Sequence, residues 1–194
     1  MPQSSRNPWL PLALLGGLAY PPLVYFGLSR LPPGVIVLFG LALIGLRLLG
    51  SWRAERQAVV AGGLALALAG AGLVALLLLS PVLAVLAYPI VISLATAAIF
   101  ALSLIRPPSV IERIARLREP DLPPRAVAYT RRVTMVWTAF LVVNALVSAA
   151  TAAWAPLSIW TLWNGLISYL LMGTLFLGEF AVRRIVRRRD LTLS

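Results

Sequence analysis

Three side chains with an amide or carboxyl group lie inside long apolar stretches of this 194-residue sequence: Asn144, Asn164 and Glu179. If these stretches cross a membrane, each asparagine is expected to hydrogen-bond to a neighbouring helix, at about 1 kcal/mol or less. We favour that structural role over a ligand site. An intramembrane acid is by default a functional candidate, but Arg183 follows Glu179 by four residues. This spacing predicts an ion pair on one helix face, close to the membrane surface.

Three residue types that carry most enzyme chemistry are missing. The chain has no Cys and no His, and all 17 of its basic residues are Arg. Disulfides, thiolate nucleophiles and Cys-ligated metals are therefore excluded, as are a histidine base and the lysine of a Schiff base or a P-loop. No two carboxylates share an apolar stretch, so the pair of carboxylates that acid–base hydrolysis would use is missing from these stretches. We expect that the chain is not an enzyme and that it has no catalytic residue, no metal site and no cofactor.

The composition indicates an integral membrane protein. Hydrophobic residues make up 60% of the chain and charged residues 12%, against about 25% charged in an ordinary soluble domain. A soluble fold needs more polar surface, and disordered chains are poor in apolar residues. The expected fold class is therefore an all-α membrane protein with a single domain, 1–194.

Six stretches with at most one charged residue each approach the roughly 20 apolar residues that a transmembrane helix needs. The predicted spans are 9–28, 34–49, 58–79, 81–105, 133–154 and 158–182, with a cytoplasmic loop at 106–132. We interpret the first stretch as a retained helix and not a signal peptide, since no small-residue cleavage site follows it.

The arginines sort between alternate loops. One side would hold sixteen of them: Arg6, Arg47, Arg53, Arg56, Arg106, Arg113, Arg116, Arg118, Arg125, Arg131, Arg132, Arg183, Arg184, Arg187, Arg188 and Arg189. The other side would hold Arg30 alone. Because basic residues concentrate in the cytoplasm, this predicts six spans of a bacterial inner membrane with both termini cytoplasmic. The net charge of +11 then indicates anionic phospholipids as partners, and no nucleic acid.

Prolines interrupt two predicted spans, at Pro21 and Pro22 in the first and at Pro89 in the fourth. A proline removes a backbone donor and kinks a helix, so a neighbouring helix or water must satisfy the freed carbonyl. A packed kink is the favoured interpretation. The alternative is that the kinked helices form the walls of a substrate cavity, as in transporters.

Small residues recur every four positions in the third span, at Gly63, Ala67 and Ala71. Such a face lets two helices approach closely. We expect it to be a packing interface, either within the bundle or between two copies in a homo-oligomer.

The loop 106–132 predicts a short amphipathic helix. Ser109 and Glu112 have the spacing of a capping box, and Val110, Ile111, Ile114 and Leu117 then form an apolar stripe. The arginines expected to contact lipid headgroups are Arg113, Arg116, Arg118, Arg131 and Arg132. An interfacial helix of this kind binds anionic lipids, whereas a loop that only enforces topology is the alternative.

The loop and the following span resemble the intracellular septation protein A family of inner-membrane-spanning proteins. The residues that carry the resemblance are Ile111-Glu112-Arg113, Leu122-Pro123, Arg131-Arg132, Trp137, Phe140 and Trp160. The chain departs from the family pattern at Ser148, where the family has Asn, and at Asn164, where it has Lys. Trp163-Asn164-Gly165 and Glu179-Phe180 are similar to a branch of membrane proteins encoded beside aryl-polyene lipid genes.

The resemblance implies a role in cell-envelope biogenesis, contact with envelope-synthesis membrane proteins, and no catalytic residue. Two functions remain open. The first is a non-enzymatic accessory or scaffold protein, and the second is a small carrier or flippase for a lipid-linked or amphipathic substrate. A carrier should lose activity when Asn144, Asn164 or Glu179 is changed, whereas a scaffold should respond mainly to the arginine loop.

Overall fold

The protein is described by a computed structural model that covers residues 9–51, 56–117 and 119–191, with side chains described outside 9–14, 17–18, 47–51, 56–61 and 183–191. Within these ranges every regular element is a helix. In chain order the elements are α1 (Trp9–Gly27), α2 (Pro33–Ser51), α3 (Arg56–Leu79), α4 (Pro81–Ile105), α5 (Val110–Arg116), α6 (Pro124–Trp154), α7 (Leu157–Leu162), the π-helical segment η1 (Trp163–Ile167) and α8 (Ser168–Leu191).

The fold is all-α and of membrane type. Four described segments are long and apolar enough to cross a membrane, namely Gly62–Leu79, Pro81–Ile105, Pro124–Trp154 and Leu157–Val182. The apolar described part of α2, Pro33–Leu46, is shorter. Large apolar side chains also cover the outside, for example Leu78, Leu79 and Phe176. Large apolar patches exposed on a protein mark a membrane or partner surface.

The helix bounds follow the sequence-derived stretches closely up to Ile105, where α4 ends as expected. The later elements differ. Helix α6 begins at Pro124, nine residues before the predicted span at 133, so the loop 106–132 is partly helical. At about 1.5 Å per residue, the 31 residues of α6 extend beyond a hydrocarbon core of about 30 Å. The arginines mark where the apolar stretch ends, and the helix continues past that point.

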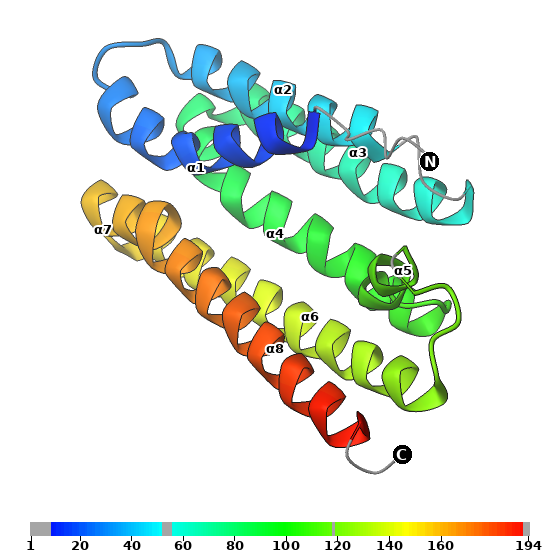
Figure 1. Ribbon diagram of the computed structural model, residues 1–194. Helices are drawn as coiled ribbons and strands as arrows, with labels where there is room; N and C mark the ends of the chain where they lie inside the picture. Colours follow the sequence, from blue (N-terminus) through cyan, green and yellow to red (C-terminus); the bar gives the residue numbers. More distant parts are fainter. Residues whose placement is uncertain (1–8, 52–55, 118, 192–194) are drawn as a thin grey trace.

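Helix α4 lies at the centre of the bundle, with α1, α2 and α3 on one side and α6 and α8 on the other (Figure 1). The helices run back and forth. The connections from α1 to α2 and from α6 to α7 lie at one end of the bundle, whereas α5 and the end of α8 lie at the opposite end (Figure 1).

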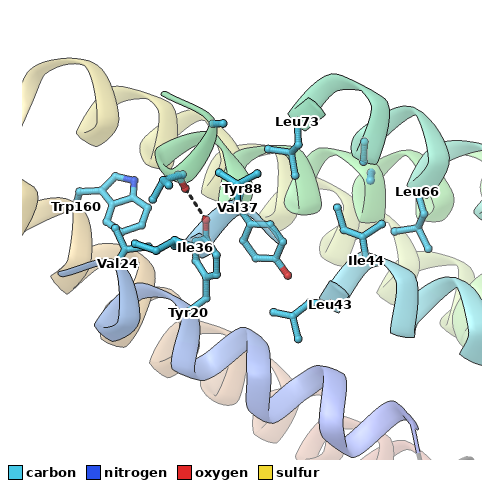
Figure 2. Packing of buried hydrophobic residues seen from close by; sticks show 14 residues of the cluster. Tyr20, Val24, Ile36, Val37, Leu43, Ile44, Leu66, Leu73, Tyr88 and Trp160 are labelled. Carbon is cyan, nitrogen blue, oxygen red and sulfur yellow. Dashed lines mark hydrogen bonds between the residues drawn. The ribbon is translucent and has the colours of Figure 1, made fainter. Parts of the chain in front are cut away.

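The apolar core lies where α1, α2, α3 and α4 meet. Figure 2 shows Tyr20 and Tyr88 side by side in this cluster, which extends from Trp160 at one edge to Leu66 at the other. The ring centroids of the two tyrosines are 4.2 Å apart. Trp160 of α7 is the one buried member of the cluster that comes from beyond α4, so it joins the last helices to the first four.

Candidate functional site

The proline of α4 leaves a carbonyl that a tyrosine of α1 satisfies. Pro89 has no N–H to donate to Val85 O, the carbonyl four residues earlier. The hydroxyl of Tyr20 donates to Val85 O over 2.9 Å in a buried position (Figure 2). A neighbouring helix therefore supplies the hydrogen bond that the proline removes.

The prolines of α1 meet the π-helical segment. Pro21 is buried and Pro22 is exposed. A Cβ atom at Gly165 would lie 3.3 Å from Cβ of Pro21, so glycine is the residue that permits this close approach. Pro21 therefore packs against η1, and Pro21, Pro22 and Pro89 all lie inside continuous helices. That the helices kink at these prolines stays a prediction.

The segment η1 interrupts the predicted sixth span. The N–H of Ser168 donates to Trp163 O, five residues earlier instead of the usual four. The side chain of Asn164 donates to Trp160 O over 2.9 Å, and the hydroxyl of Ser168 donates to Asn164 O over 3.3 Å. Side chains thus replace part of the regular backbone pattern. A π-helical turn of this kind is frequent at functional sites.

Five buried polar residues connect α4, α6 and the π-helical region, and we call them the polar seam: Ser93, Asn144, Ser148, Asn164 and Ser168. Asn144 Nδ2 donates to Ser93 Oγ over 3.2 Å, which joins α6 to α4. Ser148 Oγ donates to Asn164 Oδ1 over 2.7 Å, which joins α6 to η1. The interhelical hydrogen bonds expected of both asparagines are therefore present. Whether either asparagine also binds a ligand stays a prediction.

One buried acceptor of the polar seam has no hydrogen-bond donor among the described residues. Asn144 is 5% exposed, and its Oδ1 accepts no hydrogen bond from any residue that the structure describes. A buried polar atom without a partner carries a desolvation cost. In the bundle this acceptor is a candidate binding point.

At the other end of the bundle, Glu112 organises the short helix α5. Its backbone N–H donates to Ser109 Oγ, and its Oε2 accepts from the backbone N–H of Ser109 over 3.3 Å, so the predicted capping box is present. Arg116 donates to Oε1 of the same carboxylate through Nε at 3.0 Å and Nη2 at 2.8 Å. Val110 N–H donates to Ser103 Oγ over 3.1 Å, which ties α5 to α4.

The five arginines proposed for lipid headgroups have different surroundings. Arg116 is bonded to Glu112 and to Pro120 O, and Arg131 donates to Leu104 O at the end of α4 over 2.9 Å. Arg113 is half-buried, with its Nε unpaired among the described residues. Arg132 is exposed, and Arg118 lies outside the described residues.

Glu179 is half-buried, and its backbone carbonyl accepts from Tyr129 Oη over 3.2 Å. The predicted ion pair with Arg183 falls on a side chain outside the described part of the structure.

The small-residue face of α3 does not pack within the bundle. Ala67 and Ala71 are exposed, and a Cβ at Gly63 would meet no atom within 4 Å. The interface within the bundle was therefore the wrong alternative for this face. The contacts inside the chain use the adjacent face instead, where Leu66, Ala69 and Leu73 are buried. The interface between two copies stays a prediction.

Sequence reasoning missed Tyr20 and Ser93 as partners and gave no sign of the π-helical segment. The position of Pro89 identifies Val85 O as the carbonyl in need of a donor, but no pattern in the sequence says which helix supplies it. A π-helical turn depends on packing against other helices and has no fixed residue spacing.

Among the residues that the structure describes, no group of three or more His, Cys, Asp or Glu could hold a metal ion. No protein-family model, curated protein or solved structure matches this chain.

Proposed function

We propose that this chain is a non-enzymatic accessory or scaffold protein of the bacterial inner membrane that serves cell-envelope biogenesis. It crosses the membrane six times with both termini in the cytoplasm. The sorting of sixteen arginines against one supports this topology. The resemblance to the septation protein A family, and to the branch associated with aryl-polyene lipids, supports the envelope role and a partner among envelope-synthesis membrane proteins.

The observation that carries the proposal is the hydrogen bond from Tyr20 to Val85 O. A carrier uses broken helices because their free backbone groups bind substrate or move. In this chain the carbonyl freed by Pro89 is bonded inside the core, and Pro21 packs against Gly165. Prolines whose surroundings are hydrogen-bonded and packed in this way favour a fixed scaffold over a carrier.

The surface through which the scaffold acts is α5 with its neighbouring arginines, lying in the cytoplasmic interface as an amphipathic helix. Ile114 of α5 is 54% exposed, and Leu117 at its C-cap is 85% exposed. The capping box and the Arg116–Glu112 ion pair nevertheless fix this helix. An anchored helix that displays apolar side chains beside arginines is suited to anionic phospholipids. Arg113 and Arg132 are the residues best placed for headgroups, since Arg116 and Arg131 bond to the protein.

The absence of cysteine from the sequence makes the topology directly testable. Single-cysteine variants Ser29→Cys and Asp121→Cys would be labelled in spheroplasts with a membrane-impermeant maleimide. We expect Ser29→Cys to react from outside, and Asp121→Cys to react only after the membrane is permeabilised. Labelling of both from the same side contradicts an interpretation with six spans.

A second pair of single-cysteine variants tests the role of α5. A polarity-sensitive fluorophore on Leu117→Cys should shift to the blue in vesicles that contain anionic lipid, and should become protected from an aqueous quencher. The same fluorophore on Asp121→Cys is the matched control, and should remain accessible. Equal accessibility of the two probes contradicts an interfacial α5.

Scaffold and carrier are distinguished by what copurifies from native membranes. Mass spectrometry should recover an envelope-synthesis membrane protein, and Ile114→Asp with Leu117→Asp should lose it. Recovery of a tightly held lipid-linked precursor, lost in Asn164→Ala, would support the carrier instead.

A further inference from the structure

The amide of Asn144 has one end bonded and one end free at the crossing of α4 and α6. Nδ2 donates to Ser93 Oγ over 3.2 Å, whereas Oδ1 is buried with no donor among the described residues. With the residue 5% exposed, neither lipid nor bulk solvent reaches this oxygen from outside. Leaving it unpaired costs the desolvation of the group, so a small bound donor is favoured.

Ser148 presents a second acceptor one turn further along α6. Its hydroxyl hydrogen goes to Asn164 Oδ1 over 2.7 Å, and no described residue donates to its oxygen. Side chains four residues apart on a helix are neighbours, with Cβ atoms about 5–6 Å apart. Two hydrogen bonds of about 2.8 Å from one water span about 4.5 Å, because they leave its oxygen at an angle of about 105°. A molecule with two O–H donors is therefore of the right size to donate to two side chains with this spacing.

We propose that one water molecule binds between Asn144 Oδ1 and Ser148 Oγ and completes the hydrogen bonds of the polar seam. A lipid hydroxyl has one hydrogen to donate, but this position asks for two. Water also suits either orientation of the amide, because it pairs with the nitrogen as an acceptor when oxygen and nitrogen are exchanged. The site does not depend on the scaffold role, and it would exist equally in a carrier.

The test is nuclear magnetic resonance on the full chain in lipid nanodiscs, with ¹⁵N introduced only at asparagine. The sequence has three asparagines, Asn7, Asn144 and Asn164, so few side-chain amide signals arise. Asn7→Ser and Asn164→Ser assign two of them, and the third belongs to Asn144. Cross-relaxation from water to each amide would be measured in both the laboratory and the rotating frame. A cross peak that arises from proximity has opposite signs in the two frames, whereas one that arises from proton exchange has the same sign. We expect a cross peak from water to the Asn144 amide and none to the Asn164 amide, whose two ends are bonded to protein groups.

An Asn144 amide without a water signal overturns the proposal, as does a cross peak to a lipid hydroxyl in its place. Ser148→Ala tests the second half of the bridge and should reduce the Asn144 cross peak at least severalfold. The exposed Ser158→Ala on α7 is the matched control and should leave it unchanged. Persistence of the full signal in Ser148→Ala overturns the bridging position.

Discussion

The two sides of α4 are held together by different chemistry. Helices α1, α2 and α3 bury apolar side chains and one tyrosine among their described residues. Helix α6 instead buries Thr130, Thr134, Asn144 and Ser148 beside only two apolar residues, and its neighbour η1 buries Asn164. Thr130 and Thr134 donate to carbonyls of α6 itself, whereas Asn144 and Ser148 bond to other helical segments. The first interface therefore relies mainly on apolar packing, and the second adds hydrogen bonds between helices to its packing.

The difference matters because lipid tails are as apolar as leucine, so burial alone does not drive helices together in a membrane. The first interface relies on close approach, which Gly40 allows beside the two tyrosine rings. The second relies on side chains that find each other across helices, and these bonds are individually weak. We therefore expect the first interface to be sensitive to added volume and the second to lost polar groups.

The largest effect is expected from added volume at Gly40. A Cβ there would lie 2.9 Å from Cδ2 of Tyr88 and 3.3 Å from Cε2 of Tyr20. Overpacking of this kind should lower the free energy of unfolding by about 3 kcal/mol in Gly40→Leu. Gly45→Leu on the same helix is the control, because a Cβ there meets nothing within 4 Å. Unfolding in bicelles by steric trapping measures both, and equal losses contradict the packed interface.

The next largest effect concerns a polar contact in the first interface. Tyr20→Phe leaves Val85 O without a donor, because Pro89 cannot supply one. We expect the free energy of unfolding to fall by about 1–2 kcal/mol. Tyr25→Phe, on an exposed ring of the same helix, should change little.

A double-mutant cycle sharpens this prediction. Pro89→Ala restores a backbone N–H four residues after Val85, so the tyrosine hydroxyl becomes redundant. The cost of Tyr20→Phe should therefore shrink by at least half in the Pro89→Ala background. Strictly additive costs would show that the hydroxyl does not act on the carbonyl that the proline frees.

The sequence predicted the all-helical, membrane-type fold because hydropathy and length decide it. It also predicted the capping box of Ser109 and Glu112, and the need for a donor near Pro89, because both follow from local backbone chemistry. The early start of α6 at Pro124 was missed, since charge marks the end of an apolar stretch and not the end of a helix.

The site was predictable only in part for a related reason. Asn144 and Asn164 stand out as amides in apolar stretches, but Ser93 and Tyr20 are ordinary residues until the helices are placed side by side. The sequence offered two places for the small-residue face of α3, within the bundle or between two copies, and the first was wrong. Leu66 and Leu73 are buried in the bundle, whereas Gly63 and Ala67 are not. Small-residue spacing describes how closely a helix can be approached, and not which neighbour approaches it.

In the second interface, Ser148→Ala removes one of the hydrogen bonds that hold η1 to α6. The expected loss is about 0.6–1 kcal/mol, the typical worth of such a bond in a membrane protein. A cycle with Asn164→Ala should show a coupling of similar size, and Ser158→Ala should show none. Absence of coupling between Ser148 and Asn164 would mean that packing holds both interfaces, which removes the contrast between them.

The smallest expected effect tests whether the hydrogen bonds between α4 and α6 continue to the end of the bundle that we expect to be cytoplasmic. Arg131 of α6 donates to Leu104 O of α4, at a helix end where a cation is favoured by the exposed carbonyls. Arg131→Met should lower the free energy of unfolding by about 0.5 kcal/mol. Arg132→Met makes the same charge change on an exposed neighbour and should leave the free energy of unfolding unaffected.

Binding to anionic vesicles should reverse the order of the two variants, because Arg132 has its guanidinium available for headgroups, whereas the guanidinium of Arg131 is partly used by its bond to α4. If both variants lose stability equally, net charge and not the bond to Leu104 is responsible, and the hydrogen-bonded interface ends within the membrane.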